Sequence, residues 1–273
     1  MIEAIRAIVV YPFMTRALIA GVLLSLCAAL LGVNLVLKRC SMIGDGLSHV
    51  GFGAMALAMA AGLAPLAVAI PVVVIAAFLL LRTDAGAKLR GDSAIALIST
   101  SALAVGVMAA SLSSGMNIDI MNYMFGSILA MTRADVLWSI CLCGAVLALF
   151  IVFYRRMFCV TFDESFASAV GVHAGRYNML LAVLTAVTVV LGMRMMGALL
   201  ISSLILFPAL TAMRLCGNYR AVTLTAAGVS VVCFVLGLIV SFAAAAPTGA
   251  CIVLVNLAAY VLASFAARIL KKE

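Results

Sequence analysis

Charged residues are scarce in this chain of 273 residues: they make up 10% of it, and only nine are acidic. A soluble domain carries about 25% charged residues, so this composition excludes a soluble enzyme or binding domain. Hydrophobic residues make up 67% of the chain, and the mean hydropathy is +1.34, which predicts an integral membrane protein. The net charge of +8 reflects the Lys and Arg excess of cytoplasmic loops, and we expect no nucleic-acid partner.

Motifs for several other chemistries are also absent. The eight cysteines are scattered, mostly inside apolar runs, and none forms the C-x-x-C pair of a structural zinc site or a redox motif. We expect them to pack as small apolar side chains. The sequence has no G-x-x-x-x-G-K-[ST] phosphate-binding loop. The chain is therefore not expected to be an enzyme, and if ATP drives it, a separate protein must hydrolyse the ATP.

Charge-free apolar runs recur along the whole sequence, and each approaches the ~20 residues that cross ~30 Å of hydrocarbon as a helix. Pro247-Thr248-Gly249 supplies a turn that folds the longest run into a hairpin. We predict an all-α, polytopic transmembrane helix bundle of eight to nine spans, forming a single domain over residues 1–273. The candidate spans are 17–37, 42–63, 64–81, 93–112, 134–154, 177–193, 195–213, 221–245 and 249–267.

The positions of Lys and Arg predict the orientation of the spans. With the N-terminus outside, thirteen basic residues fall on the inner side and four on the outer side. In short loops such an excess marks the cytoplasmic side, so the C-terminus is predicted to be cytoplasmic. Residues 1–16 are interpreted as a short interfacial helix. The outer stretch 113–133 is too short to span and too apolar for a solvated loop, which predicts a half-helix entering the outer leaflet.

The inner connection is the longest polar interruption, and it predicts a short cytoplasmic helix within residues 157–175. Thr161 and Glu164 have the spacing of a capping box, and Gly171 marks the predicted end. Asp163 and Glu164 place negative charge at the N-terminus, where the helix dipole favours it.

One face of this predicted helix is apolar. Phe162 and Phe166 are followed by Ala169 and Val170 at helical spacing. A helix lying on a membrane carries Lys and Arg on its polar face, whereas this one carries acids. An acidic helix with an apolar stripe is better suited to docking into a groove of another protein, although it can also simply cap the bundle from below.

Asp45 and His49 are one helical turn apart inside the span predicted over 42–63. An ionisable group in a spanning helix costs roughly 2.5–3.5 kcal/mol on insertion scales, so a pair requires a functional explanation. At i, i+4 spacing the two side chains share one face. A carboxylate oxygen with an imidazole nitrogen suits Zn²⁺ or Mn²⁺ better than Cu(I). Helical rise counted from Arg39 places His49 about 15 Å deeper, near the middle of the bilayer.

Two ligands do not complete a coordination shell, so water, another helix or a second copy must supply the rest. Incomplete coordination suits a transported ion, which must leave again. From the residues alone, two other roles are open: Asp45 and His49 can hydrogen-bond to fix helix packing, or relay protons in a secondary transporter. Asn34 and Asn256, also inside spans, are expected to form hydrogen bonds between helices.

Five segments, in the same order along the chain, resemble the signature segments of zinc/manganese ABC-transporter permeases. One departure is Thr248, where proline is usual. The segments are LKRCSMIGDGLSH at 37–49, YMFGSIL at 123–129, TFDESFA at 161–167, GALL with PA between 197 and 209, and PTGA at 247–250.

The resemblance implies the permease subunit of a type II importer in the bacterial cytoplasmic membrane. Asp45 and His49 would line the metal path, and the metal would be transported Zn²⁺ or Mn²⁺, with no permanently bound cofactor. Zinc is the expected cargo. The alternatives are manganese or iron, a proton-coupled metal carrier that works alone, and a purely structural membrane protein.

The resemblance also implies partners. Two cytoplasmic ATPases would grip the cytoplasmic helix through the coupling residues Phe162, Asp163, Glu164 and Phe166. An extracytoplasmic metal-binding protein would dock on the outer loops, and a second copy of the chain would complete a homodimer around the path.

Overall fold

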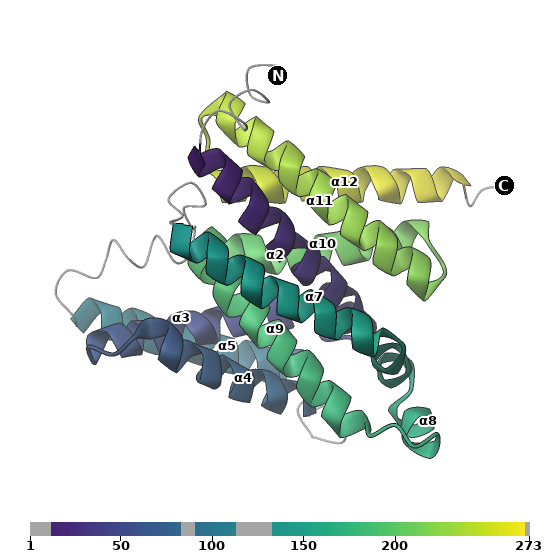
Figure 1. The fold of residues 1–273 in the computed structure, drawn as a ribbon, viewed down its shortest axis with the longest axis horizontal. Helices are drawn as coiled ribbons and strands as arrows, with labels where there is room; N and C mark the ends of the chain where they lie inside the picture. The colour runs from purple at the N-terminus through teal and green to yellow at the C-terminus, as the bar shows by residue number, and fades with distance from the viewer. Residues whose placement is uncertain (1–11, 83–90, 113–132, 271–273) are drawn as a thin grey trace.

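The computed structural model describes residues 12–82, 91–112 and 133–270, and every regular element within them is a helix (Figure 1). The all-α prediction is therefore confirmed. The described helices are α2 (Pro12–Leu37), α3 (Ile43–Ala60), α4 (Pro65–Arg82), α5 (Gly91–Leu112), α7 (Arg133–Phe162), α8 (Glu164–Ala169), α9 (Ala174–Met196), α10 (Ala198–Leu215), α11 (Tyr219–Ala244) and α12 (Thr248–Leu270).

Seven of these helices are long and apolar enough to cross a membrane, namely α2, α5, α7, α9, α10, α11 and α12. The apolar helix α4 is shorter, and α3, which carries Asp45 and His49, is not among the seven. The described residues thus support a multi-pass membrane protein with seven candidate spans, and the predicted count of eight to nine is not confirmed.

The helices form two groups with a shared core. Helices α3, α4 and α5 pack together, α2, α10, α11 and α12 form a second group, and α7 and α9 lie between them (Figure 1). Helices α2 and α9 are the most buried of the candidate spans. Their buried side chains, such as Leu24 and Met193, pack in one core with Leu47 of α3 and Leu204 of α10. This core fixes the position of α3, the helix that carries the candidate site.

Close contact between α3 and α5 depends on glycine. A Cβ atom added at Gly53 would lie 2.5 Å from the carbonyl oxygen of Ala102, and one added at Gly106 would lie 2.8 Å from the Cα of Gly53. Small residues of this kind allow membrane helices to approach backbone to backbone.

We expect Gly53→Ala to destabilise the protein, because its new methyl group meets backbone atoms that cannot rotate away. Overpacking of this kind costs about 1–3 kcal/mol, which should lower the thermal unfolding midpoint of the purified chain in detergent. The control is Gly144→Ala on α7, where an added Cβ has no heavy atom within 4 Å. Equal midpoints for the two variants would show that the contact between α3 and α5 is not as tight as described.

Several predicted boundaries are confirmed or shifted. The hairpin at Pro247-Thr248-Gly249 is confirmed, since α11 ends at Ala244 and α12 begins at Thr248. Helix α2 begins at Pro12, five residues before the predicted span, so residues 12–16 continue that span. The rest of the predicted interfacial helix and the predicted outer half-helix lie outside the described residues.

The helix predicted in the inner connection is present, but its cap differs. Helix α7 continues through Phe162, so Thr161 lies inside it and cannot cap the next helix. The N-cap of α8 is Asp163, whose carboxylate Oδ1 accepts a hydrogen bond of 2.9 Å from the backbone N–H of Phe166. The predicted capping box of Thr161 and Glu164 is therefore wrong. Gly171, with φ of 81°, follows the helix as predicted.

Candidate functional site

Asp45 and His49 lie side by side on α3. The Nε2 atom of His49 is 3.5 Å from Oδ2 of Asp45. The other carboxylate oxygen of Asp45 is 3.5 Å from the hydroxyl of Ser202 on α10, and that hydroxyl donates more closely, at 2.9 Å, to the carbonyl of Ala198. The structure therefore brings the two predicted residues together and adds a hydroxyl from a second helix.

The two side chains differ in exposure. The side chain of Asp45 is 49% exposed and that of His49 is 20% exposed. An open carboxylate cannot face hydrocarbon without a cost of a few kcal/mol. Its open side must therefore meet water, an ion or another protein surface.

The path of the chain before the site differs from the sequence-based expectation. Arg39 has a φ of 60°, and residues 38–42 form a turn that ends where α3 begins at Ile43. The continuous helical rise assumed from Arg39 is therefore wrong. His49 lies six residues beyond Ile43, so it is only about 9 Å along α3.

The two predicted ligands form a small donor set. Among the described residues, no three His, Cys, Asp or Glu side chains gather as a metal-binding group. Asp45 offers a carboxylate oxygen, His49 a ring nitrogen and Ser202 a weaker hydroxyl oxygen. Such a set can replace part of the hydration shell of a divalent cation, but it does not enclose the ion.

A network of three polar side chains joins α8 to the turn that precedes α3. The ammonium group of Lys38 donates to Oε1 of Glu164 at 2.7 Å and to Oδ1 of Asn178 at 2.8 Å. The amide of Asn178 donates to the same Glu164 oxygen at 2.9 Å. Partly exposed ion pairs contribute only about 0.2–1 kcal/mol. The network therefore matters mainly because it holds α8 beside α9 and beside the turn of residues 38–42.

Glu164 is held in its charged form by this network. Burial raises the pKa of Glu164, but the hydrogen bonds from Lys38 and Asn178 outweigh that effect and bring the pKa below its ordinary value. Because the folded-state pKa is lowered, the stabilisation is complete above the ordinary carboxyl pKa. It is lost as the pH falls through the lowered value.

The predicted role of Asn34 is confirmed, whereas that of Asn256 is wrong. Asn34 is fully buried, and its Oδ1 accepts hydrogen bonds from the Tyr219 hydroxyl at 2.8 Å and the Thr161 hydroxyl at 3.1 Å. It therefore ties α2 to α7 and α11. The amide of Asn256 instead donates to the carbonyl of Ile252 within its own helix.

The apolar stripe at the end of α7 and along α8 is exposed. Phe162, Phe166 and Val170 have about three fifths of their surface exposed, while Ala167 faces the bundle and is fully buried. Glu164 was expected on the acidic face that docks into a partner. Its carboxylate instead accepts a hydrogen bond from Lys38. Of the other predicted coupling residues, Phe162 and Phe166 belong to this exposed stripe, and Asp163 is also exposed.

Sequence reasoning missed Lys38, Asn178 and Ser202 as members of these networks. Lys38 is separated from Glu164 by 126 positions and from Asn178 by 140, and Ser202 is 157 positions from Asp45. No local spacing can reveal contacts at such separations.

Seven long apolar helices indicate a multi-pass membrane protein, and an acid and a histidine are paired on α3, which packs among them. Residues 10–267 match the ABC 3 transport family, and the chain belongs to this family of metal ABC-transporter permeases. The predicted resemblance is confirmed.

Two relatives with named cargo and one solved structure are similar over nearly the whole chain. The high-affinity zinc uptake system membrane protein ZnuB of Haemophilus influenzae is 29% identical over 255 residues, 93% of this chain and 98% of that protein. The manganese transport system membrane protein MntC of Halalkalibacterium halodurans is 27% identical over 255 residues, 93% of this chain and 87% of that protein. The structure of PsaBC from Streptococcus pneumoniae in complex with Fab superposes with a TM-score of 0.85 at 27% identity, covering 96% of this chain and 95% of that one.

Proposed function

We propose that this chain is the membrane subunit of an ATP-driven importer that carries a divalent metal ion, with zinc as the first cargo to test and manganese as the alternative. The observation that carries the proposal is the pairing of Asp45 and His49 at 3.5 Å on one helix, beside Ser202. The relatives support a metal cargo, since one is named for zinc and another for manganese.

In the proposed mechanism, an ion entering from outside exchanges some of its water for a carboxylate oxygen of Asp45 and a ring nitrogen of His49. A ligating imidazole must be neutral, so any proton on that nitrogen leaves as the ion binds. The half-open carboxylate supports a path at the surface of one chain. A second copy facing it would close the path and contribute its own Asp45 and His49.

Energy would come from partner ATPases on the cytoplasmic side, which would grip the end of α7 through Phe162 and α8 through Phe166. Asp163 holds the first turn of α8, and Glu164 links the helix to Lys38. A movement of α8 would therefore reach the turn that leads into α3 and shift Asp45 relative to Ser202. An extracytoplasmic metal-binding protein would deliver the ion, and the chain would lie in a bacterial cytoplasmic membrane with its C-terminus inside.

Cellular metal content provides the test. Cells starved of metal and carrying the intact chain with its neighbouring transport proteins are expected to accumulate more zinc than cells from which this chain is deleted. Elemental analysis of zinc, manganese and iron separates the three cargoes. A gain of manganese with no gain of zinc would support the alternative cargo. Unchanged content of all three metals would contradict the proposal, and uptake into vesicles by the purified chain without ATP would favour a proton-coupled carrier.

A further inference from the structure

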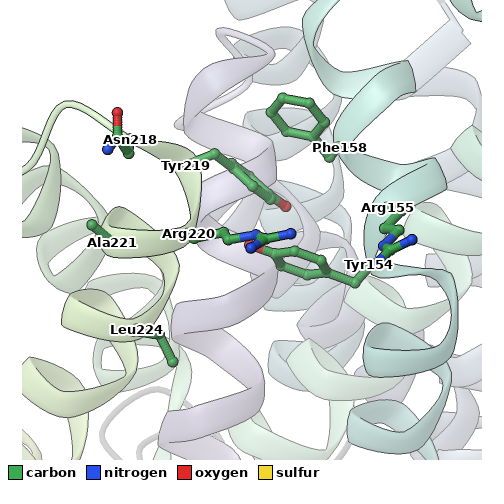
Figure 2. Close-up of a pocket in the computed structure, with 8 residues that line it drawn as sticks. All are labelled: Tyr154, Arg155, Phe158, Asn218, Tyr219, Arg220, Ala221 and Leu224. Atoms are coloured by element: carbon green, nitrogen blue, oxygen red, sulfur yellow. The ribbon is translucent and has the colours of Figure 1, made fainter.

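A second candidate site lies away from the Asp45 pair, in a cavity of about 600 Å³ between α7 and α11 (Figure 2). Its volume is within the range of small-molecule sites, roughly 300–1,000 Å³. Three aromatic rings line it, from Tyr154 and Phe158 on α7 and Tyr219 on α11. Arg155 and Arg220 bring one guanidinium group from each helix to the same cavity (Figure 2).

Both arginines stand at one boundary of the hydrocarbon layer. On α7, residues 136–154 carry no charge and end at Arg155. Their length of about 28 Å is close to the thickness of the hydrocarbon core. On α11, Arg220 precedes the charge-free residues 221–244. The cavity therefore opens where phospholipid headgroups meet the acyl chains.

The charges of Arg155 and Arg220 are uncompensated by protein. Both side chains are exposed, and within the described residues neither joins an ion pair. The next residue in the chain behaves differently, since Arg156 donates to the hydroxyl of Tyr177 at 2.7 Å. Guanidinium groups are planar donors that match the oxygens of a phosphate group, so the two free ones indicate an anionic ligand.

The walls of the cavity indicate a ligand that also has an apolar part. Leu224 is 74% exposed and Phe158 is 40% exposed, so the cavity offers apolar surface beside its two guanidinium groups. Tyrosine rings are typical of the boundary between headgroups and acyl chains, because they are apolar with a polar tip. A soluble phosphate compound would use the guanidinium groups but would leave these apolar side chains unused.

We propose that this cavity binds an anionic phospholipid, with its phosphodiester held by Arg155 and Arg220 and an acyl chain lying along Leu224. Basic pockets between membrane helices are known to favour anionic headgroups. A zwitterionic lipid is disfavoured because its ammonium group would lie near two guanidinium groups.

A lipid bound in this cavity would stabilise the packing of α7 against α11. The rings of Tyr154 and Tyr219 have centroids 5.2 Å apart across the wall of the cavity. Tyr219 also donates the hydrogen bond to Asn34 that joins α11 to α2. Because a ligand that binds only the folded state stabilises it, an anionic lipid is expected to raise the thermal stability of the chain.

Native mass spectrometry of the full-length chain in detergent tests the proposal, with phosphatidylglycerol and phosphatidylethanolamine as the added lipids. We expect phosphatidylglycerol to bind the unmodified chain more tightly than phosphatidylethanolamine. The double variant Arg155→Gln with Arg220→Gln is expected to bind phosphatidylglycerol on the order of tenfold more weakly. The matched control is Arg156→Gln with Arg176→Gln, which removes the same charge outside the cavity and should retain binding.

A second variant keeps both arginines and fills the space instead. Ala221→Trp places an indole ring in the cavity, and we expect it to weaken phosphatidylglycerol binding as well. Equal affinity in the Arg155 and Arg220 variant and in its control would overturn the proposal. Competition by glycerol phosphate or inorganic phosphate as effective as that by the lipid would also overturn it, because the site would then serve a soluble anion.

Discussion

Replacing Asp45 with Asn and His49 with Ala together is expected to abolish metal uptake, because no charged oxygen or ring nitrogen would then remain on this face of α3 to replace the water of the ion. Each single change should lower the uptake rate by more than about tenfold, since even residues that only support a metal ligand are worth 10–100-fold in affinity. The measurement is initial uptake of radioactive zinc and manganese by cells that carry the complete transporter. The amount of chain in the membrane is measured in parallel.

The matched control for this change is Ser48→Ala. Ser48 is fully buried beside His49, and its hydroxyl donates to the carbonyl of Gly44 within α3. The substitution alters the same helix without touching the pair, so uptake should stay near normal. Normal uptake in the double variant would instead leave the pair with a packing role only.

Phe166→Asp is expected to leave the chain inserted in the membrane while uncoupling ATP hydrolysis from uptake. Phe166 is 60% exposed at the protein surface, so the change creates no buried charge and should not disturb the fold. A carboxylate in an apolar docking contact opposes burial against a partner. The measurements are ATP hydrolysis stimulated by the metal-loaded binding protein, and metal uptake by the same preparation.

Ser165→Asp is the control for this second change, because it adds the same charge to the neighbouring exposed position of α8. Hydrolysis and uptake should remain coupled in that variant. If Phe166→Asp transports metal at the normal rate, the assignment of α8 as the contact with the ATPase is wrong. If both variants lose the coupling between ATP hydrolysis and uptake equally, the added negative charge causes the loss, and the loss says nothing of the apolar stripe.

The general fold followed from the sequence because apolar runs longer than the membrane thickness have few alternatives to helices. The ends of helices were less predictable, because some of them depend on which side chains are buried in the folded protein. The span over 134–154 is predicted to end before Arg155, but the helix that forms there, α7, is longer. It continues to Phe162 because Met157 and Val160 are buried against the rest of the protein, and this continuation places Thr161 inside the helix.

The candidate site was also predictable only in part, namely where its residues are close in sequence. Asp45 and His49 are neighbours on one helix, so their spacing alone brought them together. The contact with Ser202 and the network around Lys38 depend on how distant segments pack. The turn at Arg39 was missed for a related reason, since a left-handed conformation at a residue other than glycine is uncommon and gives no sequence signal.

The position of Asp45 within α3 has a further consequence for how tightly the proposed metal site would hold an ion. Asp45 lies in the first turn of that helix, where the aligned peptide dipoles amount to roughly half a positive elementary charge. That partial charge favours the bare carboxylate and repels a cation arriving beside it. We therefore expect only fleeting occupancy, which keeps the residence time short enough for the ion to pass on.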